Sequence, residues 1–216
     1  MIKLVIFDWD GTLFDSIDMI CQCMMKAGKD VGVAFRAAND IKDIIGLGLT
    51  EAIESVWPEE SKENQTLVVE RYKTLFMAGD HDSPLPYSGV LASLDTLLDK
   101  GFMMAVATGK SRRGLNRALL STDTQKYFSA TRCADETTSK PNPHMLKELL
   151  DELGVSAEEA VMVGDTEYDL MMAKNIRMPS VGVSYGAHTK DRLVKCDPVI
   201  ILDDFAELID VIEKMV

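Results

Sequence analysis

Two carboxylates near the N-terminus could form a catalytic pair. Asp8 and Asp10 follow the apolar run 4–7 and are two residues apart. Residues at that spacing project to the same side of an extended strand, so both carboxyl groups could reach one substrate if the strand continues. One could attack an electrophile while the other serves as general acid and base. Gly11 follows, and it permits a sharp turn that would bring backbone N–H groups close to an anion.

A second acidic pair, Asp165 and Asp169, follows the apolar run 160–163. These residues are four apart, so they project from one face if a helix begins near Thr166. Gathered with Asp8 around one point, they would repel one another unless a hard cation neutralised them. Mg²⁺ suits such a site because it binds carboxylates, water and phosphate oxygens. A capped, solvated first turn of a helix explains the pair equally well, and the sequence leaves both interpretations open.

Three further polar residues fit a site for a phosphorylated substrate. Lys140 precedes two prolines, so its loop is stiff, and a fixed ammonium could balance a nucleophilic carboxylate and a phosphoryl group together. Thr108 ends the apolar run 103–107 and supplies a hydroxyl. Lys110 lies with two arginines where a helix is expected to begin. Cations oppose the helix macrodipole there, which favours an anionic ligand, although a solvated surface is the alternative for the arginines.

These residues follow short apolar runs that alternate with helical periodicity, the pattern of a parallel sheet with crossover helices. Ligands bind beyond the carboxyl ends of strands in such sheets, which is where the polar residues collect. We therefore predict a doubly wound, Rossmann-like α/β fold. Its expected strands are 4–7, 103–107 and 160–163, with weaker ones near 129–133, 179–183 and 199–202. Its expected helices include 91–98, 146–153 and 205–212, where large apolar residues recur at helical spacing.

Residues 15–82 break this alternation. They contain no convincing strand, but helix-like stretches lie at 16–29, 50–56 and 63–77. The segment closes at residues 83–86, where two prolines would stiffen the return to the sheet. We predict a helical insert over 15–82 and a core made of residues 1–14 and 83–216.

Composition excludes several classes of protein. The chain has 216 residues, 46% hydrophobic and 27% charged, which is typical of a globular domain and not of a disordered or fibrous chain. Its 23 lysines and arginines against 35 aspartates and glutamates give a net charge of -12, which disfavours nucleic acid as a partner. The N-terminal apolar run is too short for a signal peptide or a membrane span, and the four cysteines include no C-x-x-C. We expect reduced thiols and a cytoplasmic protein.

The motifs, in this order, resemble those of the haloacid dehalogenase superfamily, in particular its phosphoglycolate phosphatase-like branch. Four segments carry the resemblance: DWDGTLFDS from Asp8, the strand end at Thr108, KPNP from Lys140 and GDTEYD from Gly164. The resemblance covers the whole chain, and the insert 15–82 corresponds to the helical cap of such enzymes. It implies a Mg²⁺-dependent phosphatase that hydrolyses a small phosphate monoester through an aspartyl-phosphate intermediate.

The resemblance also implies a role for each residue of the site. Asp8 would attack phosphorus, and Asp10 would protonate the leaving alcohol and then activate water. Mg²⁺ would be held by Asp8, the Asp10 carbonyl and Asp165, while Asp169 would orient the metal site or Lys140 from behind. The phosphoryl oxygens would be held by Thr108, the Gly109 amide and Lys140. Further substrate contacts are assigned to Lys110 and to the loop with Gly46 and Leu47, through which caps of this type reach the leaving group.

Several activities stay open. The dehalogenases that share this architecture lack an aspartate at the place of Asp10, so its presence favours phosphoryl transfer. Sugar-phosphate mutases and pyrophosphatases of the superfamily carry the same motifs. A phospho-acceptor signalling domain also combines carboxylates, threonine and lysine, but in another order and with no such cap. We expect a small phosphorylated metabolite as partner, no nucleic acid, no membrane, and a monomer or homodimer.

Overall fold

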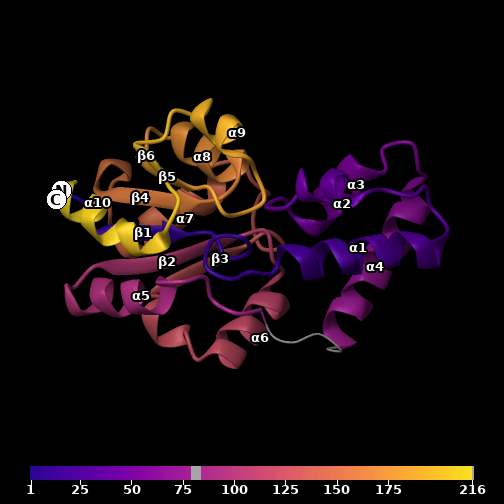
Figure 1. The fold of residues 1–216 in the computed structure, drawn as a ribbon, viewed down its shortest axis with the longest axis horizontal. Helices are drawn as coiled ribbons and strands as arrows, with labels where there is room; N and C mark the ends of the chain where they lie inside the picture. The colour runs from indigo at the N-terminus through magenta and orange to yellow at the C-terminus, as the bar shows by residue number, and fades with distance from the viewer. Residues whose placement is uncertain (79–83, 216) are drawn as a thin grey trace.

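A computed structural model describes residues 1–78 and 84–215 of the chain. Within these residues six parallel strands form one sheet in the order β3-β2-β1-β4-β5-β6 (Figure 1). The strands are β1 Leu4–Phe7, β2 Met103–Thr108, β3 Ala130–Cys133, β4 Ala160–Gly164, β5 Ser180–Val183 and β6 Ile200–Leu202. Every predicted strand is present, so the predicted doubly wound α/β sheet is confirmed.

The strand order explains where a site can form. Chain order runs outward from β1 to β2 and β3 on one side and from β4 to β6 on the other, so it reverses between β1 and β4. Ligands bind at such a reversal, beyond the carboxyl ends of the strands. The four residues of β1 are fully buried, as expected for a central parallel strand that helices cover on both faces. Asp8 leaves the sheet at this point, with its N–H still bonded to Val163 O at 3.0 Å.

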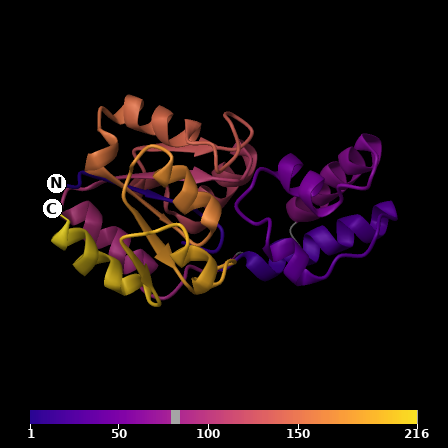
Figure 2. The same cartoon turned by 90° about the horizontal axis from the view of Figure 1, so that it is seen from above.

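Helices cover both faces of the sheet (Figure 2). Val5 and Phe7 pack with α5 Val90–Asp99, α6 Arg112–Thr122 and α10 Leu208–Lys214, and Leu4 and Ile6 pack with α7 His144–Leu153 and α8 Glu167–Lys174. A short α9, Lys190–Val194, packs on α8. The predicted helices 91–98 and 146–153 are α5 and α7. The predicted helix 205–212 begins as a 3-10 turn, Phe205–Glu207, because the carboxylate just before it accepts a backbone N–H and tightens the start. None of the described helices is long and apolar enough to cross a membrane.

In the described part of the segment between β1 and α5, four helices form a second unit, the cap, at one end of the molecule (Figure 1). They are α1 Ile17–Val31, α2 Ala38–Lys42, α3 Leu49–Val56 and α4 Lys62–Ala78. The cap has its own core, which includes Met24, Ile53, Trp57 and Val68. Three of its helices match predicted ones. The sequence does not predict α2, because five residues are too few to show helical periodicity.

Two neighbouring segments join the cap to the sheet. Phe14 forms an antiparallel bridge with Pro86, and Asp15 N donates to Leu85 O at 2.9 Å. The predicted closing stretch begins at Ser83, which lies outside the described residues. The segment that enters the cap and the segment that leaves it therefore pair at the junction between cap and sheet.

Candidate active site

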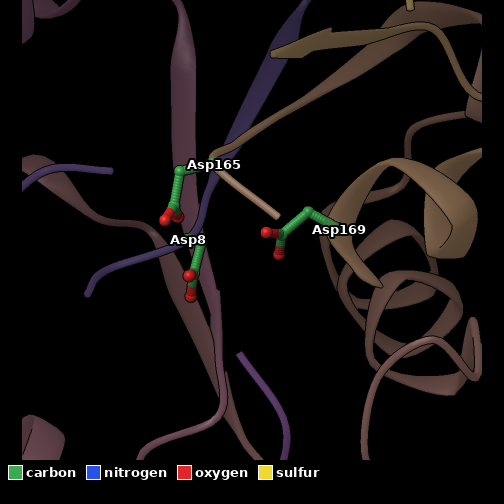
Figure 3. A group of neighbouring side chains, drawn as sticks. All are labelled: Asp8, Asp165 and Asp169. Carbon is green, nitrogen blue, oxygen red and sulfur yellow. The ribbon is translucent and has the colours of Figure 1, made fainter. Parts of the chain in front are cut away.

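Three carboxylates meet beyond the ends of neighbouring strands. Asp8 follows β1, Asp165 follows β4, and Asp169 lies in the first turn of α8 (Figure 3). All three are buried, and each offers an oxygen within 4.8 Å of the others. These are the three carboxylates that the sequence analysis considered as a group around one point.

Lys140 supplies an ammonium to this cluster. Its Nζ lies 2.7 Å from Asp8 Oδ1 and 2.7 Å from Asp169 Oδ1, and its side chain is fully buried. The other oxygen of Asp169 accepts from Thr166 Oγ1 at 2.6 Å and from Thr166 N at 3.1 Å, which closes the first turn of α8. Both oxygens of Asp169 therefore have hydrogen-bond donors, and Lys140 is one of them.

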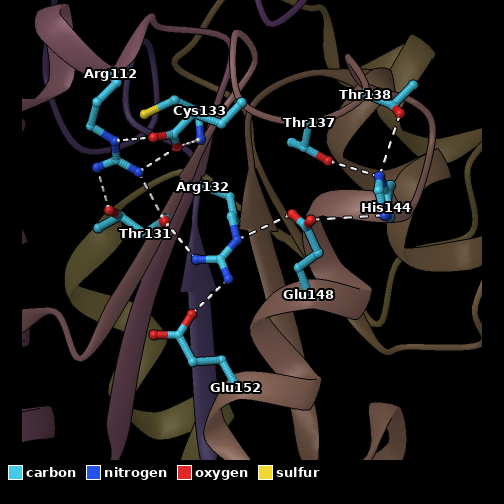
Figure 4. Close-up of polar contacts among 10 residues, drawn as sticks. Arg112, Thr131, Arg132, Cys133, Thr137, Thr138, His144, Glu148 and Glu152 are labelled. Atoms are coloured by element: carbon cyan, nitrogen blue, oxygen red, sulfur yellow. Dashed lines mark hydrogen bonds and ion pairs between the residues drawn. The ribbon is translucent and has the colours of Figure 1, made fainter.

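Two arginines tie β3 to its surroundings, one to the loop that leads to Lys140 and the other to α7 (Figure 4). Arg112, at the start of α6, pairs with Glu136 at 2.6 Å and donates to Thr131 O at 3.0 Å. Arg132 of β3 bridges to two glutamates of α7 at 3.1 Å and 2.6 Å. The guanidinium of Arg112 is therefore engaged by the loop and not by the cavity described below.

Asp165 is held on both of its oxygens. Thr12 Oγ1 donates to Oδ1 at 2.7 Å, and Ala187 N donates to Oδ2 at 2.7 Å. A Cβ on Gly186 would overlap this carboxylate, so the loop after β5 can approach it only with glycine there. Asp165 is thus fixed before any ligand arrives.

Gly11 is required by both its backbone and its neighbour. Its φ is +80, and a Cβ there would overlap the carboxylate of Asp165. Its own N–H donates to Phe14 O at 2.9 Å inside the tight turn, so any N–H group that approaches an anion here belongs to another residue.

Burial shifts the pKa values of the cluster. It raises the pKa of Asp8 well above the ordinary value, against the attraction of Lys140, and the other two carboxylates raise it further. Burial, followed by the charge of Asp169, raises the pKa of Asp165 to about 7. Burial alone would lower the pKa of Lys140, but the carboxylates of Asp169 and Asp8 outweigh it and leave that pKa above its ordinary value. Three carboxylates around one ammonium leave an excess of negative charge.

The cluster fits a divalent cation. Neither oxygen of Asp8 accepts a hydrogen bond of good geometry from a described residue, although both are buried and Lys140 lies beside Oδ1. Buried acceptors without partners are costly unless something else binds them. Asp8 and Asp165 present carboxylate oxygens, the ligand type that Mg²⁺ prefers.

Asp10 lies apart from the three carboxylates, at the junction with the cap. Its Oδ1 accepts from Ser16 Oγ and from Lys110 Nζ, the latter at 2.8 Å. The Lys110 ammonium also lies 5.0 Å from the centre of the Phe76 ring in α4. Lys110, assigned to the substrate from the sequence, is thus engaged by Asp10. Although β1 ends before it, Asp10 lines the same cavity as Asp8.

The loop between α2 and α3 packs on the strand ends. Gly46 and Leu47 lie against Gly109, where a Cβ would overlap the Leu47 carbonyl oxygen. Gly48 N donates to Ser139 Oγ at 2.7 Å, in the loop that precedes Lys140. The cap and core residues that the sequence assigned to the substrate therefore adjoin one another.

Asp43 anchors this loop to the core. Tyr168 Oη donates to Asp43 O at 2.8 Å, and Arg192 Nη1 lies 2.6 Å from Asp43 Oδ1. His188 Nδ1 accepts from Glu167 N at 3.1 Å, so the proton belongs on Nε2, which faces Asp43 O at 3.2 Å. Burial, and then Arg192, lower the pKa of His188, which agrees with a neutral ring. These residues lie outside the reactive positions of the motifs, and nothing in their spacing predicts the anchor.

A cavity of about 300 Å³ lies between the strand ends and the cap. Its polar end holds Asp8, Asp10, Thr108 and Lys110. Apolar side chains of α1, α3, α4 and the 43–48 loop make up most of the other walls, which also include Glu51, Lys73 and Asp135. Thr108 Oγ1 accepts from Lys110 N at 3.2 Å. Lys140 does not line the cavity in this structure, because it is buried behind Asp8.

The fold and the site together define a class of hydrolase with an acidic cluster at the strand ends and a helical cap. Residues 5–183 match the family model described as "Haloacid dehalogenase-like hydrolase". The chain belongs to the haloacid dehalogenase-like hydrolases, as its motifs predicted.

Individual relatives agree with this assignment over nearly the whole chain. The chain is 34% identical to "Probable phosphatase IndB" of Dickeya dadantii (strain 3937) over 97% of its own length and 93% of that protein. It is 29% identical to the phosphoglycolate phosphatase of Agrobacterium fabrum, covering 99% of this chain and 94% of that one. The crystal structure of a hydrolase from Pseudomonas syringae shares the fold, with a TM-score of 0.89 at 20% identity over 98% of both chains.

Proposed function

We propose that this protein is a Mg²⁺-dependent phosphatase that hydrolyses a small phosphate monoester through an aspartyl-phosphate on Asp8. The observation that carries the proposal is Asp8 itself. Its carboxylate is buried beside Lys140, lies at the polar end of a cavity, and accepts no hydrogen bond of good geometry from a described residue on either oxygen. Two relatives whose names describe them as phosphatases support the same reaction.

In the first step an oxygen of Asp8 attacks phosphorus, and the bond from phosphorus to the alcohol oxygen breaks. Asp10 gives its proton to that departing oxygen. Ser16 and Lys110 hold Oδ1 of Asp10, and no described residue donates to Oδ2. Oδ2 is therefore the atom that carries the proton toward the substrate.

In the second step Asp10, now ionised, takes a proton from water. The water oxygen attacks phosphorus, and the bond from phosphorus to Asp8 breaks, which returns the Asp8 carboxylate and releases inorganic phosphate. The closed cap limits the water that can reach the site, since its 46–48 loop lies directly on the strand ends.

The remaining residues manage charge. Lys140, held by Asp169, offsets the charge of Asp8 so that an anionic phosphoryl group can approach it. Thr108 and the Gly109 amide would donate to phosphoryl oxygens, and their position in the lining of the cavity that also holds Asp8 supports this role. Mg²⁺ would be held by Asp8, Asp165 and the Asp10 carbonyl, where it would supply positive charge against the carboxylates and the phosphoryl oxygens.

The proposal includes the organisation of the chain and its setting. We assign residues 15–82 to the cap and residues 1–14 and 83–216 to the catalytic core. We further propose a small phosphorylated metabolite as substrate and a monomer or homodimer in the cytoplasm. None of the four cysteines is in a disulfide among the residues that the structure describes, and all four are buried, which suits a reducing compartment.

Release of phosphate from p-nitrophenyl phosphate tests the proposal. Wild type with Mg²⁺ is expected to turn over, EDTA to abolish turnover, and Asp8→Asn to abolish it with the fold intact. Asp151→Asn, the same substitution at an exposed site on α7, is the matched control. Turnover by Asp8→Asn at the level of that control would reject Asp8 as nucleophile. Transfer of phosphate to a second sugar hydroxyl, without release, would instead indicate a mutase.

A further inference from the structure

The residues that line the cavity indicate which kind of alcohol the proposed phosphatase releases. Its reactive end recognises only the phosphoryl group, so the remaining walls must meet the rest of the substrate. Most of those walls are aliphatic or aromatic side chains of the cap. Tyr72 and Phe76 of α4 contribute two stacked rings, with centres 5.6 Å apart and planes 24° apart.

Each cation on these walls already lies beside a carboxylate, among the residues that the structure describes. Lys110 Nζ is paired with Asp10 at 2.8 Å, and its side chain is only 9% exposed. Lys73 Nζ lies 2.8 Å from the carboxylate of Glu70, but both side chains are more than half exposed, so solvent screens this pair and the charge of Lys73 as well. No arginine lines the cavity.

The walls do carry an unpaired anion. Glu51 of α3 lines the cavity, and no described residue forms an ion pair or hydrogen bond with its carboxylate. That carboxylate lies over the 46–48 loop, since a Cβ on Gly48 would come within 2.5 Å of Glu51 Oε2. A carboxylate on the leaving group would enter the same cavity as this charge, and such repulsion discriminates between ligands as effectively as attraction does.

We propose, on the basis of the function above, that the cavity selects phosphate monoesters of uncharged, ring-bearing alcohols and rejects phosphorylated carboxylic acids. Tyr72 and Phe76 provide a surface for the ring beside the ester oxygen. Glu51 excludes an acidic leaving group. The substrate class thus differs from phosphoglycolate, whose leaving group is a small acid.

Four substrates separate the two features. Ethyl phosphate and phosphoglycolate differ by a carboxylate on a small leaving group, and benzyl phosphate and para-carboxybenzyl phosphate differ by a carboxylate on a ring. The expected kcat/KM is about tenfold or more higher for the uncharged member of each pair, and higher for benzyl than for ethyl phosphate by a similar factor.

Variants at the walls assign each preference to a residue. Glu51→Gln is expected to shrink the preference for the uncharged member of each pair, and Glu51→Arg to reverse it. Asp151→Arg makes the same change of charge on exposed α7 and is expected to leave both ratios unchanged. Tyr72→Leu is expected to reduce the preference for benzyl over ethyl phosphate without changing the ratio within a pair.

The outcomes distinguish this inference from the function on which it rests. A wild-type enzyme that hydrolyses phosphoglycolate at least as efficiently as ethyl phosphate would overturn the inference and leave the phosphatase intact. Ratios that respond equally to Glu51→Arg and to Asp151→Arg would also overturn it. Hydrolysis of none of the four esters in the presence of Mg²⁺ would overturn the proposed function and the inference together.

Discussion

Replacing Lys140 by methionine tests the charge balance of the site. The substitution keeps the length of the side chain and removes an ammonium that lies 2.7 Å from both Asp8 and Asp169. Breaking a buried ion pair from one side costs about 3–5 kcal/mol of unfolding free energy, because the partner charge stays buried without compensation. Here two carboxylates lose one shared partner, so the upper part of that range is expected in metal-free protein.

The effect of Lys140→Met depends on pH. Burial raises the pKa of Asp8, and loss of the ammonium raises it further, so a proton can neutralise the carboxylate in acid. A carboxyl whose folded pKa is raised binds more protons in the folded than in the unfolded state. Its effect on stability is therefore favourable at low pH and is lost as pH rises through the folded pKa. The destabilisation by Lys140→Met is expected to be larger at about pH 8 than at about pH 5.5.

Urea unfolding of EDTA-treated protein at both pH values measures this difference. Lys190→Met is the matched control, because Lys190 pairs with Asp203 at 3.0 Å on the surface, with side chains 52% and 71% exposed. Screened pairs of this kind contribute little. Turnover of every phosphate ester is expected to fall about a hundredfold or more for Lys140→Met, since it loses a charge that stabilises the transition state. The reasoning is refuted if the two variants unfold at the same urea concentration at both pH values.

Three other perturbations probe the cavity and the cluster. Gly11→Ala should lower the free energy of unfolding by about 1–2 kcal/mol, because alanine is strained in a left-handed backbone, and should weaken Mg²⁺ binding by displacing Asp165. Gly101→Ala, at φ +79 with open space around it, should lose stability only through the backbone strain. Equal Mg²⁺ affinities of the two variants in calorimetry would contradict this prediction. Burial raises the pKa of Asp165 to about 7 and also raises the pKa of Asp8, so protons compete with the cation for these carboxylates. Mg²⁺ affinity should therefore weaken as pH falls below 7, and Mg²⁺ binding should release protons, which titration calorimetry in two buffers measures. A Mg²⁺ affinity that does not change with pH would contradict this prediction. Leu47 and Leu49 line the cavity, so Leu47→Ala and Leu49→Ala should change the ranking of phosphate esters by kcat/KM more than they change the melting temperature. Leu67→Ala, at a residue of α4 that is 51% exposed, should change neither. A lower melting temperature with an unchanged ranking would show that both leucines serve packing only.

The sequence predicts where the polar residues at the strand ends meet, because the carboxyl ends of parallel strands lie at one edge of a sheet. Asp8, Thr108 and Asp165 each follow a buried apolar run, and parallel strands deliver their ends to one edge of the sheet. Local spacing also predicts the main helices of core and cap. For the predicted pair of Asp8 and Asp10 the structure adds a contact that spacing does not indicate: Asp10 Oδ1 is bonded to Lys110 Nζ at 2.8 Å, while both carboxylates line the same cavity.

The contacts between cap and core could not be predicted from spacing. Asp43 meets Tyr168 and Arg192, which are 125 and 149 positions away along the chain. Their meeting depends on how the cap docks, which a single sequence does not encode in any local pattern. Glu51 and Tyr72 likewise have no distinguishing pattern in the sequence, and it is the docked cap that brings them into the same cavity as Asp8.

Direct detection of phosphate on Asp8 tests the central claim. Wild-type protein with Mg²⁺ and radiolabelled p-nitrophenyl phosphate would be quenched in acid during turnover, and the labelled peptide identified by mass spectrometry. The account predicts label that resists acid, is released by hydroxylamine as an acyl phosphate is, lies on the peptide containing Asp8, and is absent from Asp8→Asn. Turnover without any label on protein, or label on a peptide that lacks Asp8, would contradict the account.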